Sequence, residues 1–161
     1  MTEIRVRAAS EADVPLIFAF IRELAEYERL SHEVVATEDS LREWLFGERP
    51  VAEVLIGESG GDAAGFALFF HSFSTFLGKP GIYLEDLYVR PEFRSRGIGR
   101  ALLIHLARLA RQRGYGRLEW SVLDWNEPAI GFYRGIGASP VSGWTVYRVT
   151  GQELEDLAGH R

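Results

Sequence analysis

The stretch from Ile82 to Gly114 constrains the fold most, because it combines a strand, a glycine-bearing turn and a long helix in direct succession. Apolar and aromatic residues dominate its first eight positions, which favours a buried strand. Pro91 ends that strand, since proline cannot donate to a β-ladder. From about Ile98 the apolar residues recur with a helical period, and Gly114 is a typical helix C-cap. The stretch therefore predicts a central strand that leads through a tight turn into an amphipathic helix.

The turn between this strand and helix suits an anion. Gly97 and Gly99 lack a Cβ atom, so a ligand can approach the backbone closely. The free N–H groups of a first helical turn point outward together, and the helix macrodipole adds positive potential. Arg94, Arg96 and Arg100 add charge around the turn. A phosphate site is one interpretation, and a helix start that only needs tight packing is the other, because two spaced glycines often recur by chance.

Length and composition limit the functions open to the chain. Its 161 residues are expected to form a single domain, residues 1–161, of ordinary globular composition. The absence of cysteine excludes thiolate metal sites, and the four histidines show no paired metal spacing. No run approaches the roughly 20 apolar residues of a membrane helix, and the net charge of −5 argues against nucleic acid and for small cationic partners. We therefore expect a cytoplasmic protein with no metal, no membrane association and no nucleic acid partner.

The remaining segments predict a mixed α/β domain with the order β-α-α-β-β-β-α-β-α-β. Alternating or apolar runs predict strands at residues 4–8, 51–58, 63–73, 82–89, 117–123 and 144–149. Helices are expected after caps at Asp13, Thr37 and Asn126, and a capping box is expected to open a last helix at Thr150. The first helix is expected to bury the following residues: Val14, Ile17, Phe18, Ile21, Leu24 and Ala25. We also expect core positions for Phe66, Phe69, Phe70 and Phe73.

Several motifs together resemble one enzyme family. The pattern Arg94-x-x-Gly97-x-Gly99 matches the pyrophosphate loop of the GNAT N-acetyltransferase superfamily, R/Q-x-x-G-x-G/A. The runs LEDLYV (84–89), DWNEPAIGFYRGIGA (124–138) and ELAEYE (23–28) are similar to its diamine (spermidine/spermine) acetyltransferase branch. The similarity covers nearly the whole chain. It implies a GNAT-like fold, in which a mixed, mostly antiparallel sheet carries helices on both faces and splays between the central strand and the next.

The resemblance implies acetyl-CoA as co-substrate and assigns residues to it. The pyrophosphate is expected to bind the loop Arg94, Ser95, Arg96, Gly97, Ile98, Gly99 and Arg100. Backbone N–H groups of Leu87, Tyr88 and Val89, freed at a bulge, are expected to contact the pantetheine arm and the thioester carbonyl. Asn126, Ala129 and Tyr133 match further positions that contact coenzyme A in the family.

The same resemblance proposes two catalytic side chains. Glu85 matches the proposed base of the diamine branch, and a protonated amine needs such an acceptor before it can attack. Tyr133 matches the family's general acid, which protonates the leaving thiolate. From the residues alone, the alternative interpretation of Glu85 is a member of a salt bridge at the sheet edge. The alternative for Tyr133 is an ordinary aromatic residue of an amphipathic helix. Strand alternation places Glu85 and Asp86 on opposite faces, so we expect no carboxylate pair.

Substrate contacts are expected from Tyr27, Glu28, Glu85, Glu119 and Trp120, with plain surface roles for Tyr27 and Glu28 as the alternative. The short SPVSG segment (139–143) and Phe76, where spermidine enzymes tend to have tryptophan, argue against long polyamines. The expected substrate is a small cationic amine, namely a diamine, a polyamine or a lysine-like amino acid, and these two features leave the shorter diamines and the lysine-like amino acids open. A peptide acetyltransferase or a silent acetyl-CoA sensor are the other functions, and the branch implies a homodimer.

Overall fold

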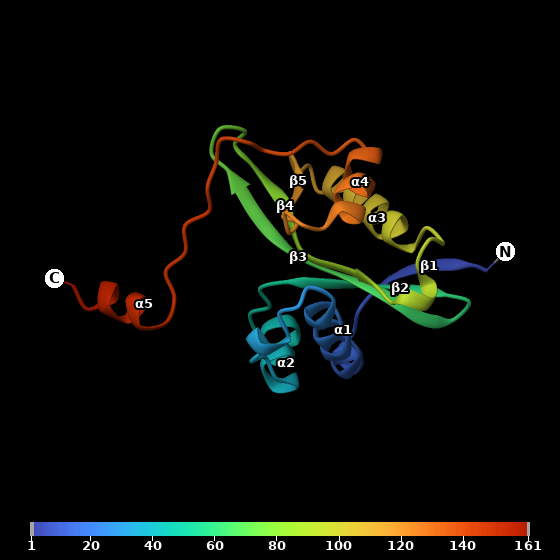
Figure 1. Ribbon diagram of the computed structural model, residues 1–161, viewed down its shortest axis with the longest axis horizontal. Coiled ribbons are helices and arrows are strands. Elements are labelled where there is room, and N and C mark those ends of the chain that lie inside the picture. Colours follow the sequence, from blue (N-terminus) through green and yellow to red (C-terminus); the bar gives the residue numbers. More distant parts are fainter. Residues whose placement is uncertain (1, 161) are drawn as a thin grey trace. The chain divides into compact units, whose positions relative to one another are not determined.

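The computed structural model describes residues 2–160, which form two compact units divided after Ser121. The first unit is built on a five-stranded sheet with the order β1-β2-β3-β4-β5 (Figure 1). Its strands are β1 Ile4–Ala8, β2 Glu53–Ser59, β3 Asp62–Ser74, β4 Lys79–Val89 and β5 Leu118–Trp120. β1 to β4 pair antiparallel, and only β5 runs parallel to its neighbour β4. The predicted mixed, mostly antiparallel sheet is confirmed.

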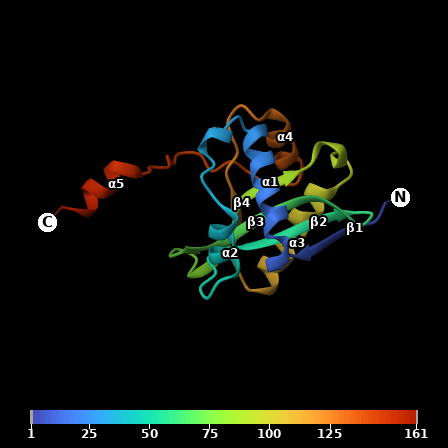
Figure 2. The ribbon, with the colours of Figure 1, turned by 90° about the horizontal axis from the view of Figure 1, so that it is seen from below.

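Helices cover both faces of this sheet. α1 (Val14–Tyr27) and α2 (Glu38–Phe46) lie on one face, and α3 (Ile98–Gln112) lies on the other (Figures 1 and 2). Three short 3-10 turns, η1 Glu11–Asp13, η2 Ser31–Glu33 and η3 Pro91–Phe93, connect these elements. The second unit contains α4 (Glu127–Gly135) and α5 (Gly151–Ala158). None of the described helices is both long and apolar enough to span a membrane.

The face under α1 has an aromatic core. The ring of Phe20 stacks on that of Phe66 with 5.2 Å between their centroids, and Tyr88 packs against Phe20 edge-on at 6.3 Å. Phe18 and Ile21, which were expected to be buried, are only partly buried. Helical periodicity fixes the width of the apolar stripe but not its rotation, and here the stack on Phe66 turns Phe20 inward.

α3 packs unusually close to the sheet. Ile98, Leu102 and Leu106 are fully buried there, as predicted. A Cβ atom at Gly57 of β2 would lie 2.9 Å from the Ile98 side chain. Glycine at this position therefore lets α3 pack directly onto the sheet, which fixes where the N-terminus of α3 lies relative to β4.

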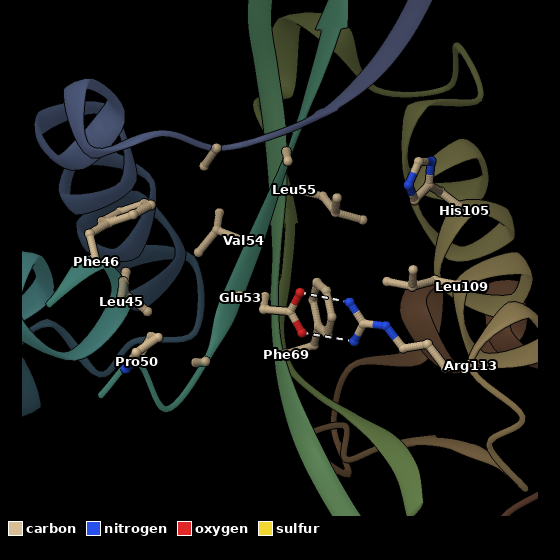
Figure 3. Close-up of a pocket in the computed structure, with 13 residues that line it drawn as sticks. Leu45, Phe46, Pro50, Glu53, Val54, Leu55, Phe69, His105, Leu109 and Arg113 are labelled. Carbon is tan, nitrogen blue, oxygen red and sulfur yellow. Dashed lines mark hydrogen bonds and ion pairs between the residues drawn. The ribbon is translucent and has the colours of Figure 1, made fainter. Parts of the chain in front are cut away.

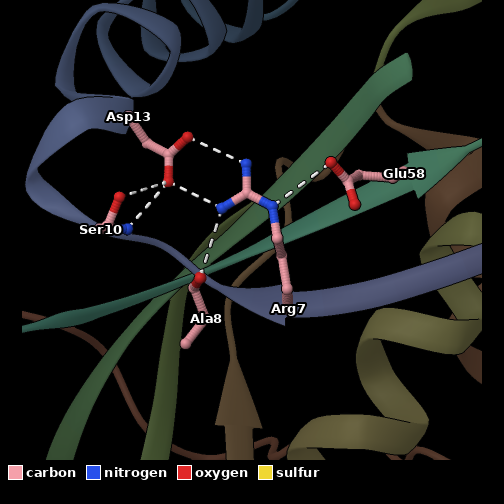
Figure 4. A network of polar contacts seen from close by, with 5 residues as sticks. All are labelled: Arg7, Ala8, Ser10, Asp13 and Glu58. Carbon is pink, nitrogen blue, oxygen red and sulfur yellow. Dashed lines mark hydrogen bonds and ion pairs between the residues drawn. The ribbon is translucent and has the colours of Figure 1, made fainter. Parts of the chain in front are cut away.

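An ion-pair network joins β1 to the start of α1 (Figure 4). The Arg7 guanidinium donates to both carboxylate oxygens of Asp13 at 2.8 and 2.9 Å and to Glu58 at 3.3 Å. Asp13 also accepts the backbone N–H of Ser10 at 2.8 Å. Asp13 stands at the N-cap position of α1, as predicted, but its carboxylate makes no cap hydrogen bond. The Arg7 hydrogen bonds lower the pKa of Asp13 to about 2.

Several predicted boundaries are wrong within the first unit. β4 begins at Lys79, inside the predicted loop, because residues 79–81 pair with the far end of β3. β5 is shorter than the predicted strand 117–123 and covers only three residues. Phe73 lies near the exposed end of the β3–β4 hairpin with 65% of its surface accessible, so it is not a core residue.

The second unit departs most from the sequence-based expectation. Residues 144–149 are strand-like in sequence but form no strand in the described part of the chain. The side chains of Trp144, Val146 and Tyr147 are more than 80% exposed. Thr150 is the N-cap of α5, but its side chain makes no cap hydrogen bond, so the predicted capping box does not form. A strand needs a pairing partner, which local sequence cannot supply.

Candidate active site

A β-bulge in β4 lies at the predicted catalytic position. Leu84 pairs with Phe69 of β3, and Asp86 pairs with Leu68, which leaves Glu85 as an extra residue without a partner in the β3 register. Because such a bulge inserts one residue, the side chains after it point to the faces opposite to those that simple alternation predicts. A bulge, as the family resemblance implied, is therefore present, but it is centred on Glu85, two residues before the stretch Leu87–Val89 where it was expected.

The bulge overturns the expected separation of the two carboxylates. Asp86 lies opposite Leu68, which packs on the core under α1. Leu84 lies opposite Phe69, which faces the α3 side with His105 and Leu109. Glu85 follows Leu84 and so turns to the α1 face, and after the phase change Asp86 lies on that face as well. The prediction that Glu85 and Asp86 occupy opposite faces is wrong, because alternation fails at an inserted residue.

Glu28 completes this acidic group from another element. α1 ends at Tyr27, and Glu28 is its C-cap residue. Burial raises the pKa of Glu28. Burial also raises the pKa of Asp86 to about 7, and the nearby carboxylates of Glu85 and Glu28 add to the shift. Glu85 and Glu28 thus both lie close enough to Asp86 to disfavour its ionisation.

The edge of β4 opens directly after the bulge. β5 pairs with β4 only from Ile82 to Leu84, so among the described strands none pairs with this edge beyond Leu84. The N–H of Arg90 donates to β3, and the carbonyl of Tyr88 faces Gly65 of β3. By alternation the backbone groups of Leu87 and Val89 face the open edge, so two of the three predicted backbone donors point there.

The loop after β4 has the geometry of an anion site. Ser95 and Gly97 both have positive φ values, 63° and 87°, which turn successive N–H groups toward a common point. Gly97 is the N-cap of α3 and no side chain caps that end, and no acid stands in the first turn. Arg96 and Arg100 are exposed beside it. These residues fit a pyrophosphate, so the described loop can hold the diphosphate of coenzyme A.

The side chain of Arg94 contacts β4 and two tyrosine rings, whereas its charge alone suggests a position facing the phosphate. Its Nε atom donates to the carbonyl of Val89 at 2.9 Å. Its guanidinium lies over the rings of Tyr27 at 5.1 Å and Tyr88 at 5.8 Å. Arg94 therefore joins the loop to the end of β4 and to the last residue of α1. This contact brings Tyr27, a predicted substrate residue, next to the predicted cofactor loop.

The two predicted substrate residues of β5 lie on different faces. Glu119 is in register with Tyr83, and Trp120 with Leu84. Tyr83 contacts Phe70 and lies on the α1 face, so Glu119 shares the face of the acidic group, whereas Trp120 lies on the α3 face. The carboxylate of Glu119 is already paired with Arg117 at 3.0 Å.

Three predicted residues belong to the second unit. Asn126 is the N-cap of α4, where its side chain accepts the N–H of Ala129 at 3.4 Å. Tyr133 lies on the same helix beside Phe132, with 5.6 Å between ring centroids. The predicted cap is confirmed, and the roles of Asn126, Ala129 and Tyr133 stay predictions.

A separate pocket lies away from these residues (Figure 3). It has a volume of about 310 Å³, and Glu53 and Arg113, which form an ion pair at 2.8 Å, are among the residues that line it. His105 and Phe69 also line it, but none of the predicted site residues does. Within the described residues no group of three or more His, Cys, Asp or Glu side chains is arranged to hold a metal ion.

Comparison with known proteins identifies the family. The model of the acetyltransferase (GNAT) family matches residues 18–138. The chain belongs to the GNAT acetyltransferase family. Membership makes it an acyltransferase, and this family uses acetyl-CoA. The match includes the bulge, the open edge and the glycine loop.

The relatives lie in the diamine branch. The chain is 41% identical to a thialysine N-epsilon-acetyltransferase of Bos taurus, with 99% of both chains covered. It is 34% identical to an L-ornithine N5-acetyltransferase of Arabidopsis thaliana, over 95% of this chain and 87% of that one. An integron cassette protein of V. cholerae has a similar structure, with a TM-score of 0.81, 28% identity and 98% of both chains covered.

Sequence reasoning missed Asp86 of this site and did not foresee the contacts that Arg94 makes. Asp86 was set aside because alternation assigned it to the other face, and no local signal marks the bulge that reverses this. Arg94 was expected to bind phosphate, whereas one side of its guanidinium is used by Val89 and two tyrosine rings. An adjacent Glu-Asp pair within a strand of a GNAT-like sequence is the signal that could have identified Asp86 as a site residue.

Proposed function

We propose that the protein transfers the acetyl group of acetyl-CoA to a primary amine of a small cationic substrate. The observation that carries the proposal is the continuity of three features along β4: the carboxylates at the bulge, the open backbone edge at Leu87 and Val89, and the anion loop that follows. This order matches the order of the reacting parts, with the amine at the bulge, the thioester beside the open edge and the diphosphate at the loop.

The residues have distinct roles in this proposal. The N–H groups of Ser95 to Arg100 bind the diphosphate, and Arg96 and Arg100 add charge. The N–H groups of Leu87 and Val89 bind the pantetheine arm and polarise the thioester carbonyl, where one such donor typically lowers the barrier by about 3 kcal/mol. Bound acetyl-CoA supplies the activated acetyl group. Tyr133 supplies the proton that the leaving sulfur needs, because a phenol O–H can donate to a developing thiolate.

The acidic group selects a cationic amine. Glu28, Glu85 and Asp86 gather negative charge on the α1 face, and Tyr27 adds an aromatic ring at 38% exposure. Relatives that act on thialysine and ornithine support a lysine-like or ornithine-like amino acid. We therefore favour short ω-amino substrates over long polyamines, as the short 139–143 segment also suggests.

Thiol release from acetyl-CoA tests this function directly. Thialysine, lysine, ornithine, 1,3-diaminopropane, spermidine and a lysine-containing peptide would be compared by kcat/KM. We expect turnover of the amino acids or the diamine, with the peptide at least tenfold slower. Tight acetyl-CoA binding in calorimetry without turnover of any amine would contradict the proposal and favour a sensor.

We also propose a homodimer that uses the segment 141–149. Its Val141, Trp144, Val146 and Tyr147 side chains are exposed, and its strand-like sequence has no pairing partner in the described residues. Unpaired strand-like backbone invites pairing with another chain. A second copy carries the same segment, so reciprocal pairing satisfies both copies at once.

A further inference from the structure

Asp86 combines properties that the assigned roles leave unexplained. It is partly buried on β4, one residue after the bulge and one before the open edge. Within residues 2–160 its carboxylate makes no hydrogen bond or ion pair. A partly buried carboxyl group without such a partner costs folding free energy when it ionises, so its presence calls for a functional explanation.

The neighbours of Asp86 are acidic or apolar and give its carboxylate no cationic partner. Glu85 lies next to it on β4, Glu28 faces it from the end of α1, and the neighbour on β3 is the apolar Leu68. Two cations at this end of the sheet are bound by other groups. Arg90 is bound by Glu23 at 3.0 Å, and Arg94 donates to the Val89 carbonyl. The position is therefore open to a cation supplied by a ligand.

We propose that Asp86 is a catalytic proton acceptor, which takes the proton of the substrate ammonium while Glu85 and Glu28 hold the cation. This assignment rests on the proposed amine acetyltransferase function. Its geometric basis is the phase change at Glu85, which turns Asp86 to the same face as Glu28 and sets it directly before the open edge of β4.

The proton transfer balances in charge and atoms. An N–H bond of the ammonium breaks and an O–H bond forms on the Asp86 carboxylate, directly or through one water, which leaves a neutral amine. Its lone pair forms the C–N bond to the acetyl carbon as the C–S bond breaks, and the sulfur takes up a proton. The nitrogen passes its second proton to water, which balances the proton that the sulfur takes up. Asp86 releases its own proton to water, so the reaction frees one proton overall. A base works best when its pKa lies near the working pH, and the pKa of Asp86 is raised to about 7.

Kinetics of the wild type and two variants test the assignment. We would measure kcat/KM from pH 5.5 to 9 for wild type, Asp86→Asn and Asp86→Glu, with thialysine or the amine of the panel that turns over fastest. The amine's own titration cancels in the ratio of wild type to variant. We expect the ratio for Asp86→Asn to rise with pH, with a midpoint near about 7, to 100-fold or more at high pH. Asp86→Glu should recover part of the rate.

Controls separate this outcome from a structural effect. Asp62→Asn, at the exposed β2–β3 turn, should keep a ratio near one at every pH. Calorimetry should give the same acetyl-CoA affinity for Asp86→Asn and wild type, which shows an intact fold. A ratio that stays flat with pH, or a rate within twofold of wild type, would overturn the role of Asp86. Absence of wild-type turnover on every amine would instead overturn the proposed function.

Direct titration gives a readout that is independent of activity. Carboxyl-carbon NMR of the wild-type protein should show Asp86 titrating near pH 7, and a titration near pH 4 would contradict the proposal. Thermal unfolding adds a second measurement. Because the folded-state pKa of Asp86 is raised, its ionisation destabilises the fold as pH rises from about 4 to 7. Asp86→Asn should therefore melt higher than wild type at pH 8, and this gain should vanish toward pH 4.

Discussion

At the scale of single residues, two aspartates of the first unit represent two opposite kinds of ionisable group. Asp13 is held by Arg7 through two hydrogen bonds, and its pKa is lowered to about 2. Asp86 has no cation beside it in the described chain, and its pKa is raised to about 7. The first kind stabilises the fold at neutral pH and the second destabilises it. Side chains that cost stability in this way are typical of functional sites.

The Asp13 carboxylate gives a testable stability effect. Its folded-state pKa lies below its unfolded value of 3.8, so its contribution is present above about pH 4 and is lost as pH falls toward 2. We expect Asp13→Asn to lower the free energy of unfolding by about 2 kcal/mol at pH 7. Urea unfolding at pH 7 and at pH 3 measures the change, which should be clearly smaller at pH 3.

A matched control uses another aspartate that pairs with arginine. Asp39 contacts Arg42 at 3.1 Å, but its side chain is 97% exposed. Exposed pairs contribute little, so Asp39→Asn should change stability by less than about 1 kcal/mol. Equal losses of unfolding free energy in the two variants would show that the network of Figure 4 stabilises the fold no more than an exposed ion pair does.

At the scale of elements, the join of β4 to α3 determines what the site can bind. The strand leaves its partner β5 after Leu84, makes a bulge, and passes through η3 into a loop with two left-handed residues, Ser95 and Gly97. Each step removes backbone groups from regular pairing. The freed N–H groups at Leu87, at Val89 and in the loop are what an acyl thioester and a diphosphate need.

The two glycines of the loop should respond differently to alanine. Gly97 has a φ of 87°, which costs an alanine about 1 kcal/mol or more, although space is available there. Gly99 has ordinary helical geometry, and a Cβ atom would meet Val89 at 3.8 Å without a clash. Gly97→Ala should therefore destabilise the fold and weaken coenzyme A binding, and Gly99→Ala should leave both nearly unchanged. Urea unfolding and calorimetry with coenzyme A check the pair. The explanation fails if Gly99→Ala is as damaging as Gly97→Ala.

At the scale of the whole molecule, the segment 141–149 presents apolar side chains that a soluble monomer rarely leaves exposed. Tyr147 and Trp144 are 91% and 83% exposed, and neighbouring Val146 is 84% exposed. A second copy of the chain is the partner that a segment of this kind fits, because each copy carries the same unpaired stretch.

Light scattering of the wild-type protein should give about twice the monomer mass of 18.1 kDa at micromolar concentration. The double variant Trp144→Ser/Tyr147→Ser should shift the protein toward monomer. Val35→Ser, at an isolated side chain that is 89% exposed, should leave the mass unchanged. A wild-type monomer at 100 μM would rule out the dimer.

The sequence by itself determined the features that depend on neighbouring residues. The strand, turn and helix between Ile82 and Gly114 follow from apolar period and from glycine and proline, and the caps at Thr37 and Asn126 form as expected. These features need only local backbone preferences and side chains a few residues away. The family also followed from sequence, because its motifs are contiguous.

Only the tertiary structure decided the positions that depend on a partner far along the chain. The bulge at Glu85 exists because β3 and β4 pair with a shifted register, and that shift moved Asp86 to the face of Glu28. The rotation of α1 was set by Phe66, and Arg94 turned toward Tyr27 and Tyr88. Residues 144–149 remained unpaired, since β-pairing depends on long-range contacts that alternation alone does not encode.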